Sequence, residues 1–238
     1  MANPHFQSMI TFAGNTVPTK HLKDLPMFQQ YASDQTFYGY SNDFFTYQAD
    51  DWTITTTEAG TGSATEAVTS SAGGALLLTN AAGDNDNDFL QLKGESFKLS
   101  SSKRAYFSAR FKCNDVDQSD IVIGLQITDT SPLDVTDGIF FISNDGDAGL
   151  DFLVEKDNSA TTTEDVATLA DDTFITVAWY IDPDRSAVYY SINNAEPVKV
   201  VNTNLPDDEE LTVSIGIQNG EATAQTLTVD YVTAIVER

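Results

Sequence analysis

The sequence predicts an all-β fold in which two antiparallel sheets pack face to face, preceded by an extended N-terminal arm. From Asn42 onward, short runs rich in Val, Ile, Thr and aromatic residues alternate with clusters of Gly, Asn, Asp, Ser and Thr, which is typical of a sandwich or barrel. No helical run of moderate length competes with them. We count about thirteen runs, more than one sheet usually holds, so two packed sheets are expected.

The expected strands cover residues 43–47, 52–57, 75–79, 88–93, 105–113, 121–127, 138–143, 149–156, 174–182, 186–193, 197–202, 211–218 and 225–236. The longest break between them is the polar stretch at 155–172, which we interpret as a loop without regular structure. No internal repeat with a fixed period divides the chain, and its 238 residues are compatible with one main domain.

The aromatic hairpin FITVAWYIDPDRSAVYYSINN at 174–194 shows how the strands are expected to face the core. Because side chains alternate along a strand, one face carries the apolar set Val177, Trp179, Ile181, Val188, Tyr190 and Ile192. The other face carries Tyr180 and Tyr189. Between the two strands, Asp182-Pro183-Asp184-Arg185 is a turn in which Pro183 fixes the backbone.

Charge separates an N-terminal arm, residues 1–41, from a sandwich domain, residues 42–238. The whole chain has 12 Lys and Arg against 36 Asp and Glu, a net charge of −24, whereas residues 1–40 are neutral. The arm has room for a short helix, and its apolar side chains are candidates for binding a partner: Phe6, Ile10, Phe12, Leu22, Leu25 and Phe28. Either the arm packs on its own domain or it reaches a partner subunit.

The acidic charge also excludes some partners. A net charge of −24 repels the phosphates of nucleic acids and anionic membrane surfaces, so we expect neither as a ligand. The chain has no apolar run near the ~20 residues of a membrane-spanning helix. Its N-terminus shows no export signal, and we expect a protein made and used in soluble form.

The sequence predicts no catalytic residues. A glycosidase needs two carboxylates flanking the scissile bond, and Glu155 and Asp157, placed on one expected strand, lack a third acid at the required spacing. The two histidines, His5 and His21, lie in the arm, which offers little preorganisation for a nucleophile. The single cysteine, Cys113, is expected to be a small apolar strand residue.

We expect neither a cofactor nor a metal ion. The stretch GDNDNDFLQLKGE at 83–95 places Asp84, Asp86 and Asp88 at alternate positions, which partly matches a calcium loop. Phe89, however, stands where that loop needs a glycine for its sharp turn. We therefore favour a polar turn between strands, with calcium binding as the alternative.

Several stretches resemble a phage-type concanavalin A-like, laminin-G-like sandwich: GIFFIS at 138–143, GLDFLVEKD at 149–157, the hairpin within 172–200, LTVSIGIQNG at 211–220 and TLTVDYVTAIVE at 226–237. The resemblance implies a jelly-roll sandwich over residues 42–238. Proteins with this look, preceded by a short arm, resemble virion components of tailed bacteriophages, especially decoration or cement proteins, and the resemblance implies that role for this chain. A decoration protein is made in the host cytoplasm, binds the major capsid protein on the outer capsid surface and stabilises that lattice.

That role implies sister subunits, with a homotrimer as the natural guess at threefold lattice positions. The alternative function is a carbohydrate-binding, lectin-like module on a phage tail or fibre, which would recognise a surface glycan. Binding a glycan needs exposed aromatic side chains beside polar groups, and Tyr180, Tyr189 and Trp52 are the candidates.

Overall fold

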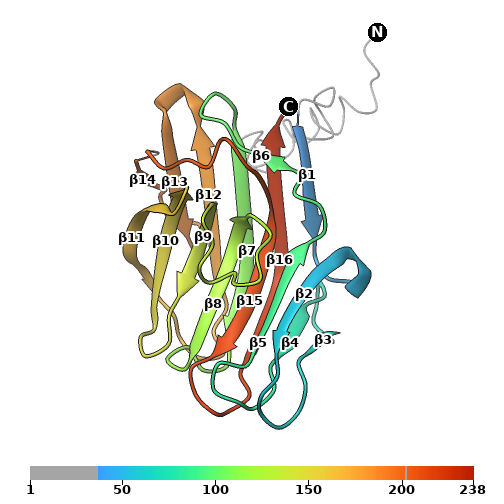
Figure 1. The fold of residues 1–238 in the computed structure, drawn as a ribbon. Coiled ribbons are helices and arrows are strands. Elements are labelled where there is room, and N and C mark those ends of the chain that lie inside the picture. The colour runs from blue at the N-terminus through green and yellow to red at the C-terminus, as the bar shows by residue number, and fades with distance from the viewer. Residues whose placement is uncertain (1–36, 202) are drawn as a thin grey trace.

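A computed structural model describes residues 37–201 and 203–238 as a sandwich of two eight-stranded antiparallel sheets (Figure 1). The predicted all-β jelly-roll fold is confirmed. The six apolar arm residues named above as partner-binding candidates all lie outside the described residues. In the described part of the chain, no helix is long and apolar enough to cross a membrane.

We call the two sheets front and back. The names do not refer to the direction of view, since in Figure 1 the sheet that we call front lies behind the other. The front sheet runs in the order β14 (Val198–Val200), β13 (Ala187–Ile192), β12 (Ile175–Asp182), β7 (Ala105–Cys113), β16 (Thr226–Glu237), β4 (Leu76–Thr79) and β3 (Thr65–Val68), and β1 (Phe37–Asn42) also pairs with β16. The back sheet runs in the order β11 (Ser159–Thr168), β10 (Gly149–Lys156), β9 (Gly138–Ser143), β8 (Ser119–Gln126), β15 (Glu210–Asn219), β5 (Asn87–Leu92) and β2 (Trp52–Thr57), and β6 (Phe97–Lys98) also pairs with β15. Two 3-10 turns, η1 (Ala49–Asp51) and η2 (Pro183–Arg185), complete the described elements.

The main core lies between the sheets and is rich in aromatic rings. From the front sheet, Phe107 and Trp179 stack with their centroids 5.9 Å apart. From the back sheet, Phe141 and Phe152 lie 4.8 Å apart, and Phe152 also contacts Tyr190 of β13. The predicted inward face of the hairpin is therefore confirmed, since its aromatic side chains join the two sheets.

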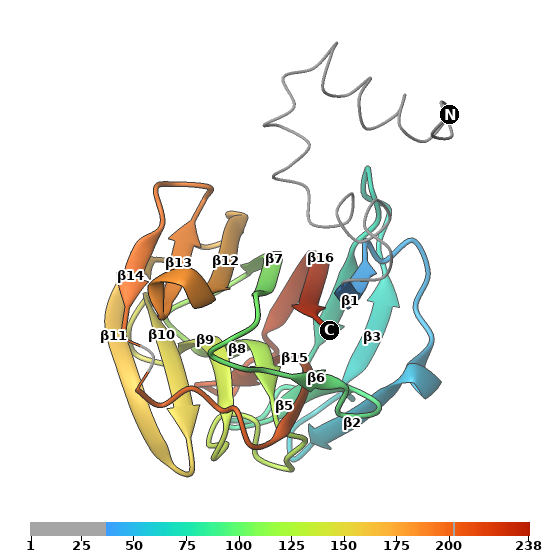
Figure 2. The same cartoon turned by 90° about the horizontal axis from the view of Figure 1, so that it is seen from above.

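A second apolar layer covers the outer face of the back sheet. Phe89, Val122, Phe140 and Ile142 lie there, beneath the connection at 127–137. Two buried glutamines of the back sheet hold that connection, because Gln91 accepts from the backbone N–H of Asp129 (2.9 Å) and Gln126 donates to the carbonyl of Pro132 (2.9 Å). The outer face of the front sheet has no such cover within the described residues, and Figure 2 shows it curved, with β7 and β16 at the bottom of the curve.

The first strand differs from the prediction. Residues 43–47, expected to be a strand, form a connection in which Phe44 adopts a positive φ of 50°. Asn42 causes this break, since its side-chain oxygen accepts a hydrogen bond from the backbone N–H of Phe44 (2.8 Å). The strand itself is β1, so the sandwich starts ahead of the predicted boundary at residue 42.

The prediction of an unstructured loop at 155–172 is also wrong. β10 and β11 form a hairpin whose turn is made by Asp157 and Asn158, both with positive φ. The stretch looked polar because β11 is an edge strand with mostly exposed side chains, in which threonines supply the β-branched character. Asp157 therefore lies in a turn and does not share a strand with Glu155.

Candidate functional site

Three tyrosines form a row on the outer face of the front sheet. Tyr106 of β7 is directly opposite Tyr180 of β12, and Tyr180 is directly opposite Tyr189 of β13. Directly opposite residues point to the same side of a sheet, and here that side is away from the core. On the other side of Tyr106 the row continues through Ile235 of β16 to Gly39 of β1.

The row runs across the strands, not along them. Neighbouring strands lie about 4.8 Å apart, so the three tyrosines span about 10 Å, and the row from β1 to β13 spans about twice that. These outward-facing side chains thus form a row, here called the platform, whose long axis crosses the sheet.

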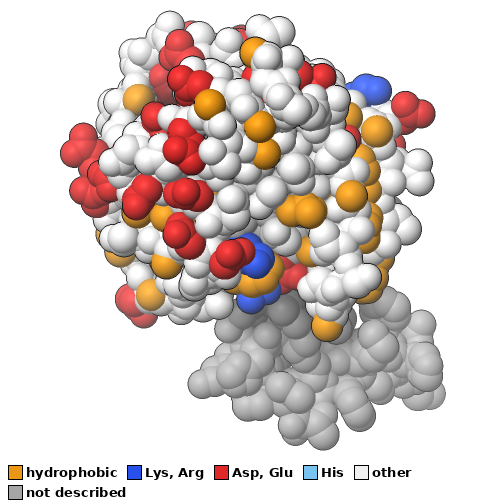
Figure 3. Space-filling view, turned by 90° about the horizontal axis from the view of Figure 1, so that it is seen from below, with side chains coloured by type: hydrophobic (Ala, Val, Ile, Leu, Met, Phe, Trp, Pro, Cys, Tyr) orange, Lys and Arg blue, Asp and Glu red, His pale blue; other side chains and the backbone are white. Residues whose placement is uncertain are grey.

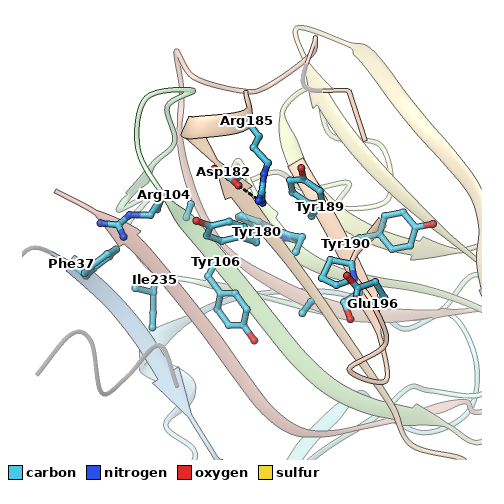
Figure 4. Close-up of a pocket in the computed structure, with 15 residues that line it drawn as sticks. Phe37, Arg104, Tyr106, Tyr180, Asp182, Arg185, Tyr189, Tyr190, Glu196 and Ile235 are labelled. Carbon is cyan, nitrogen blue, oxygen red and sulfur yellow. Dashed lines mark hydrogen bonds and ion pairs between the residues drawn. The ribbon is translucent and has the colours of Figure 1, made fainter. Parts of the chain in front are cut away.

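A groove of about 550 Å³ lies over this platform (Figure 4). Its volume is in the range of small-molecule and cofactor sites. Five strands, the turn η2 and the β6–β7 and β13–β14 connections supply its lining: Phe37, Arg104, Ala105, Tyr106, Ala178, Trp179, Tyr180, Asp182, Arg185, Tyr189, Tyr190, Ser191, Glu196, Pro197 and Ile235.

One border of the groove is an arginine–carboxylate pair. The side chain of Arg104 donates to Glu237 through two nitrogens, Nε to Oε2 and Nη2 to Oε1, each at 3.0 Å. The backbone N–H of Arg104 adds a third bond to Oε2 (3.0 Å), and the guanidinium lies 5.1 Å from the ring centre of Phe37. These hydrogen bonds lower the pKa of Glu237 and keep it ionised.

The other border is the turn between β12 and β13. Asp182 ends β12, and its Oδ1 accepts from the backbone N–H of Asp184 (3.0 Å), which starts the turn η2 in the predicted place. Its Oδ2 accepts from Nη1 of Arg185 (3.1 Å). Asp182 is 7% exposed, whereas the side chain of Arg185 is 71% exposed and points from the turn toward Tyr180 and Tyr189 (Figure 4).

A second polar group lies farther along the same face. A bulge in β16 leaves Asp230 and Tyr231 both facing outward, since the register with β7 shifts between Val229 and Tyr231. Asp230 pairs with Arg110 (2.5 Å), whose guanidinium lies 4.0 Å from the ring centre of Phe174. The Asp230 carboxylate is therefore occupied by a cation, as Glu237 and Asp182 are.

The acidic stretch at 83–95 does not bring its carboxylates together. Asp84 is exposed, and Asp86 is buried, where it accepts three backbone N–H groups, from Ala59 (2.6 Å), Gly60 (2.9 Å) and Gly83 (2.8 Å). These bonds make it the anchor of a polar turn. Among residues 37–238 other than 202, no group of three or more Asp, Glu, His or Cys side chains is placed to hold a metal ion.

Asp88 has a different environment. It is fully buried on the inner side of β5, and neither of its oxygens has a hydrogen-bond partner among the described residues. Burial, together with the nearby Glu66, raises its pKa from 3.8 to about 8. At neutral pH, Asp88 is thus largely protonated, far from the groove.

Two of the three aromatic residues proposed from the sequence, Tyr180 and Tyr189, lie in the groove. Trp52 does not, because it is 3% exposed and faces the core. Sequence reasoning missed Tyr106, although the strict alternation in AYFSARFKC places its side chain on the outer face, next to the inward-facing Phe107 in the sequence. It also missed Arg104, whose partner Glu237 is 133 residues away along the chain.

No family model matches the sequence, and no curated protein is similar to it. Solved structures with similar folds include a protein of unknown function from Shewanella oneidensis MR-1, with 15% identity, a TM-score of 0.61 and coverage of 92% of this chain and 94% of that one. An endo-1,3-beta-glucanase from Streptomyces sioyaensis has 13% identity and a TM-score of 0.58, with coverage of 87% of this chain and 98% of that one. The carbohydrate recognition domain of Emp46p has 10% identity and a TM-score of 0.55, with coverage of 83% of this chain and 95% of that one.

These similarities establish the fold. The protein is a jelly-roll sandwich of the concanavalin A-like kind found in glucanases and lectins.

Proposed function

We propose that the protein binds a glycan chain in the groove on the outer face of the front sheet. The observation that carries the proposal is the row of Tyr106, Tyr180 and Tyr189, bordered by two arginine–carboxylate pairs. A sugar ring has apolar C–H faces that pack on aromatic rings, and it has hydroxyl groups that hydrogen-bond to planar charged groups at its edge. The groove offers both kinds of contact at once.

The shape of the groove favours a chain over a single sugar. The platform crosses several strands from Phe37 to the β13–β14 connection, so an extended ligand can contact successive side chains along it. Two structural neighbours act on or recognise carbohydrates by name, the endo-1,3-beta-glucanase and the carbohydrate recognition domain. Both use the same sandwich, which supports the proposal by analogy of fold.

The proposed activity is binding, not hydrolysis. Glycoside hydrolysis needs one carboxylic acid with a raised pKa to protonate the leaving oxygen. Glu237, at the border of the groove, has the opposite environment, since its hydrogen bonds with Arg104 lower its pKa. Ion-paired carboxylates suit the acceptance of hydroxyl hydrogen bonds.

Capsid decoration, with a major capsid protein as partner, stays a prediction from the sequence, based on the family resemblance, the neutral apolar arm and the acidic charge of the remainder. Its candidate residues in the arm lie outside the described part of the chain. A glycan-binding groove is the function that the described residues support.

A glycan array probed with the full-length protein tests the proposal. We expect saturable binding to at least one polysaccharide, and loss of that binding in Tyr180→Ala and Tyr189→Ala. Phe45→Ala is the matched control, because Phe45 is 71% exposed and does not line the groove. An array without any saturable signal, or a signal that the tyrosine variants leave intact, would contradict the proposal.

A further inference from the structure

We infer that the groove selects uncharged glycan chains over acidic ones, and that Glu237 and Asp182 impose this selection. The inference rests on the proposed function above and adds the class of ligand. It starts from the two arginines that line the groove, because a free guanidinium is a good partner for a sugar carboxylate or sulfate.

Neither arginine is free of a carboxylate. Arg104 gives two side-chain nitrogens to Glu237 in the bidentate arrangement that a carboxylate ligand would otherwise use. An acidic sugar could take this bidentate edge only by displacing Glu237, which also holds the backbone N–H of Arg104. Displacement would break three hydrogen bonds before new ones form, so a neutral hydroxyl is the better guest.

The second arginine, Arg185, is also paired with a carboxylate, but through one hydrogen bond. Nη1 of Arg185 donates to Asp182, which is largely buried and also caps the turn η2. The groove lining holds two arginines and two carboxylates, Asp182 and Glu196, and Arg104 is paired with Glu237, which lies outside the lining. There is no excess of positive charge along this lining to attract an anion.

The charge of the whole molecule acts in the same direction. The chain has a net charge of −24, and on the face that Figure 3 shows, acidic side chains are many and basic ones few. A polyanionic chain approaching the groove is repelled by this field, and the repulsion weakens with salt because screening lengths fall to about 10 Å at 0.1 M. An uncharged chain meets no such barrier.

The test compares two polymers of similar length, a neutral glucan and a polyuronate, by isothermal titration of the full-length protein at low and physiological ionic strength. The unmodified protein is expected to bind the neutral polymer at least about tenfold more tightly, a difference of about 1.4 kcal/mol. Glu237→Gln and Asp182→Asn each remove the negative charge that pairs with one guanidinium. Each is expected to raise the ratio of polyuronate to glucan affinity about tenfold.

Glu164→Gln is the matched control, since it removes one negative charge from the exposed edge strand β11, away from the groove. It should leave the affinity ratio unchanged. Asn at position 182 can still cap the turn, so this variant is informative even if Glu237→Gln fails to fold.

The outcomes separate the two proposals. If the unmodified protein binds the polyuronate as tightly as the glucan, or tighter, charge selection is wrong while glycan binding stands. An equal change of ratio in Glu164→Gln and the groove variants would also overturn it, because net charge alone would then explain the effect. If neither these polymers nor the array glycans bind, the proposed function itself fails.

Discussion

The outer face of the back sheet is apolar and lies beneath a connection, whereas the outer face of the front sheet carries polar and aromatic side chains that line a groove. On the back sheet, Phe140 and its neighbours pack beneath the connection at 127–137. On the front sheet, equivalent outward positions hold Tyr106, Tyr180 and Tyr189. Within the described residues, one outer face is thus packed under a connection and the other carries the groove that we propose for recognition, a division that substitutions can test.

The largest effect is expected on the covered face. Phe140 is 1% exposed, so Phe140→Ala should lower the free energy of unfolding by about 3–5 kcal/mol through lost burial and a residual cavity. Urea denaturation measures this change. A loss as small as that of an exposed residue would mean that the connection does not cover this face in solution.

Tyr180→Ala should mainly lower glycan affinity and should have the smaller effect on folding stability. Binding aromatics at the centre of a site commonly contribute about 2–4 kcal/mol, so glycan affinity should fall at least about thirtyfold. Its outward position predicts a smaller loss of folding stability than that of Phe140→Ala. Titration calorimetry and denaturation of the same sample compare the two values, and equal losses of stability would remove the distinction between the faces.

A third test uses the buried Asp88, which belongs to neither outer face. Because its folded pKa, about 8, lies above the unfolded value of 3.8, the folded state holds this proton more tightly. Its contribution to stability is full below the unfolded pKa and is lost as the pH rises through about 8. Asp88→Asn cannot ionise, so its free energy of unfolding relative to that of the unmodified protein should rise by about 3 kcal/mol between pH 5 and pH 7.

Thermal unfolding at these two pH values measures that difference. The glycan affinity of Asp88→Asn should equal that of the unmodified protein at both pH values, since Asp88 does not line the groove. Parallel pH profiles for Asp88→Asn and the unmodified protein would show that Asp88 is not protonated in the folded state.

The smallest effect is expected at the second polar group of the front face. Arg110 pairs with Asp230, and the two side chains are 38% and 20% exposed, so Arg110→Gln should cost at most about 1 kcal/mol of stability. High salt should reduce the cost further. A loss of several kcal/mol would indicate that this pair is structural, like the covered back face.

Sequence alternation predicted much of the fold because it depends on local pattern. It placed Trp179 in the core and Tyr180 and Tyr189 on the opposite face. It failed where local chemistry overrides pattern, at the Asn42 break before Phe44 and in the polar edge strand β11.

The groove could be predicted only in part. The tyrosine row depends on the register that joins β7 to β12, and the Arg104–Glu237 pair joins residues 133 positions apart. Such contacts are set by the packing of whole strands, which a local pattern does not contain.

The most direct test of the central claim is a nuclear magnetic resonance titration of the full-length protein with a glycan that it binds on the array. We expect the shifted signals to gather on Tyr106, Tyr180, Tyr189 and the backbone around Arg185, with the back sheet unchanged. Shifts centred on the back sheet, or no saturable shifts in the groove, would contradict the assignment of recognition to the front face.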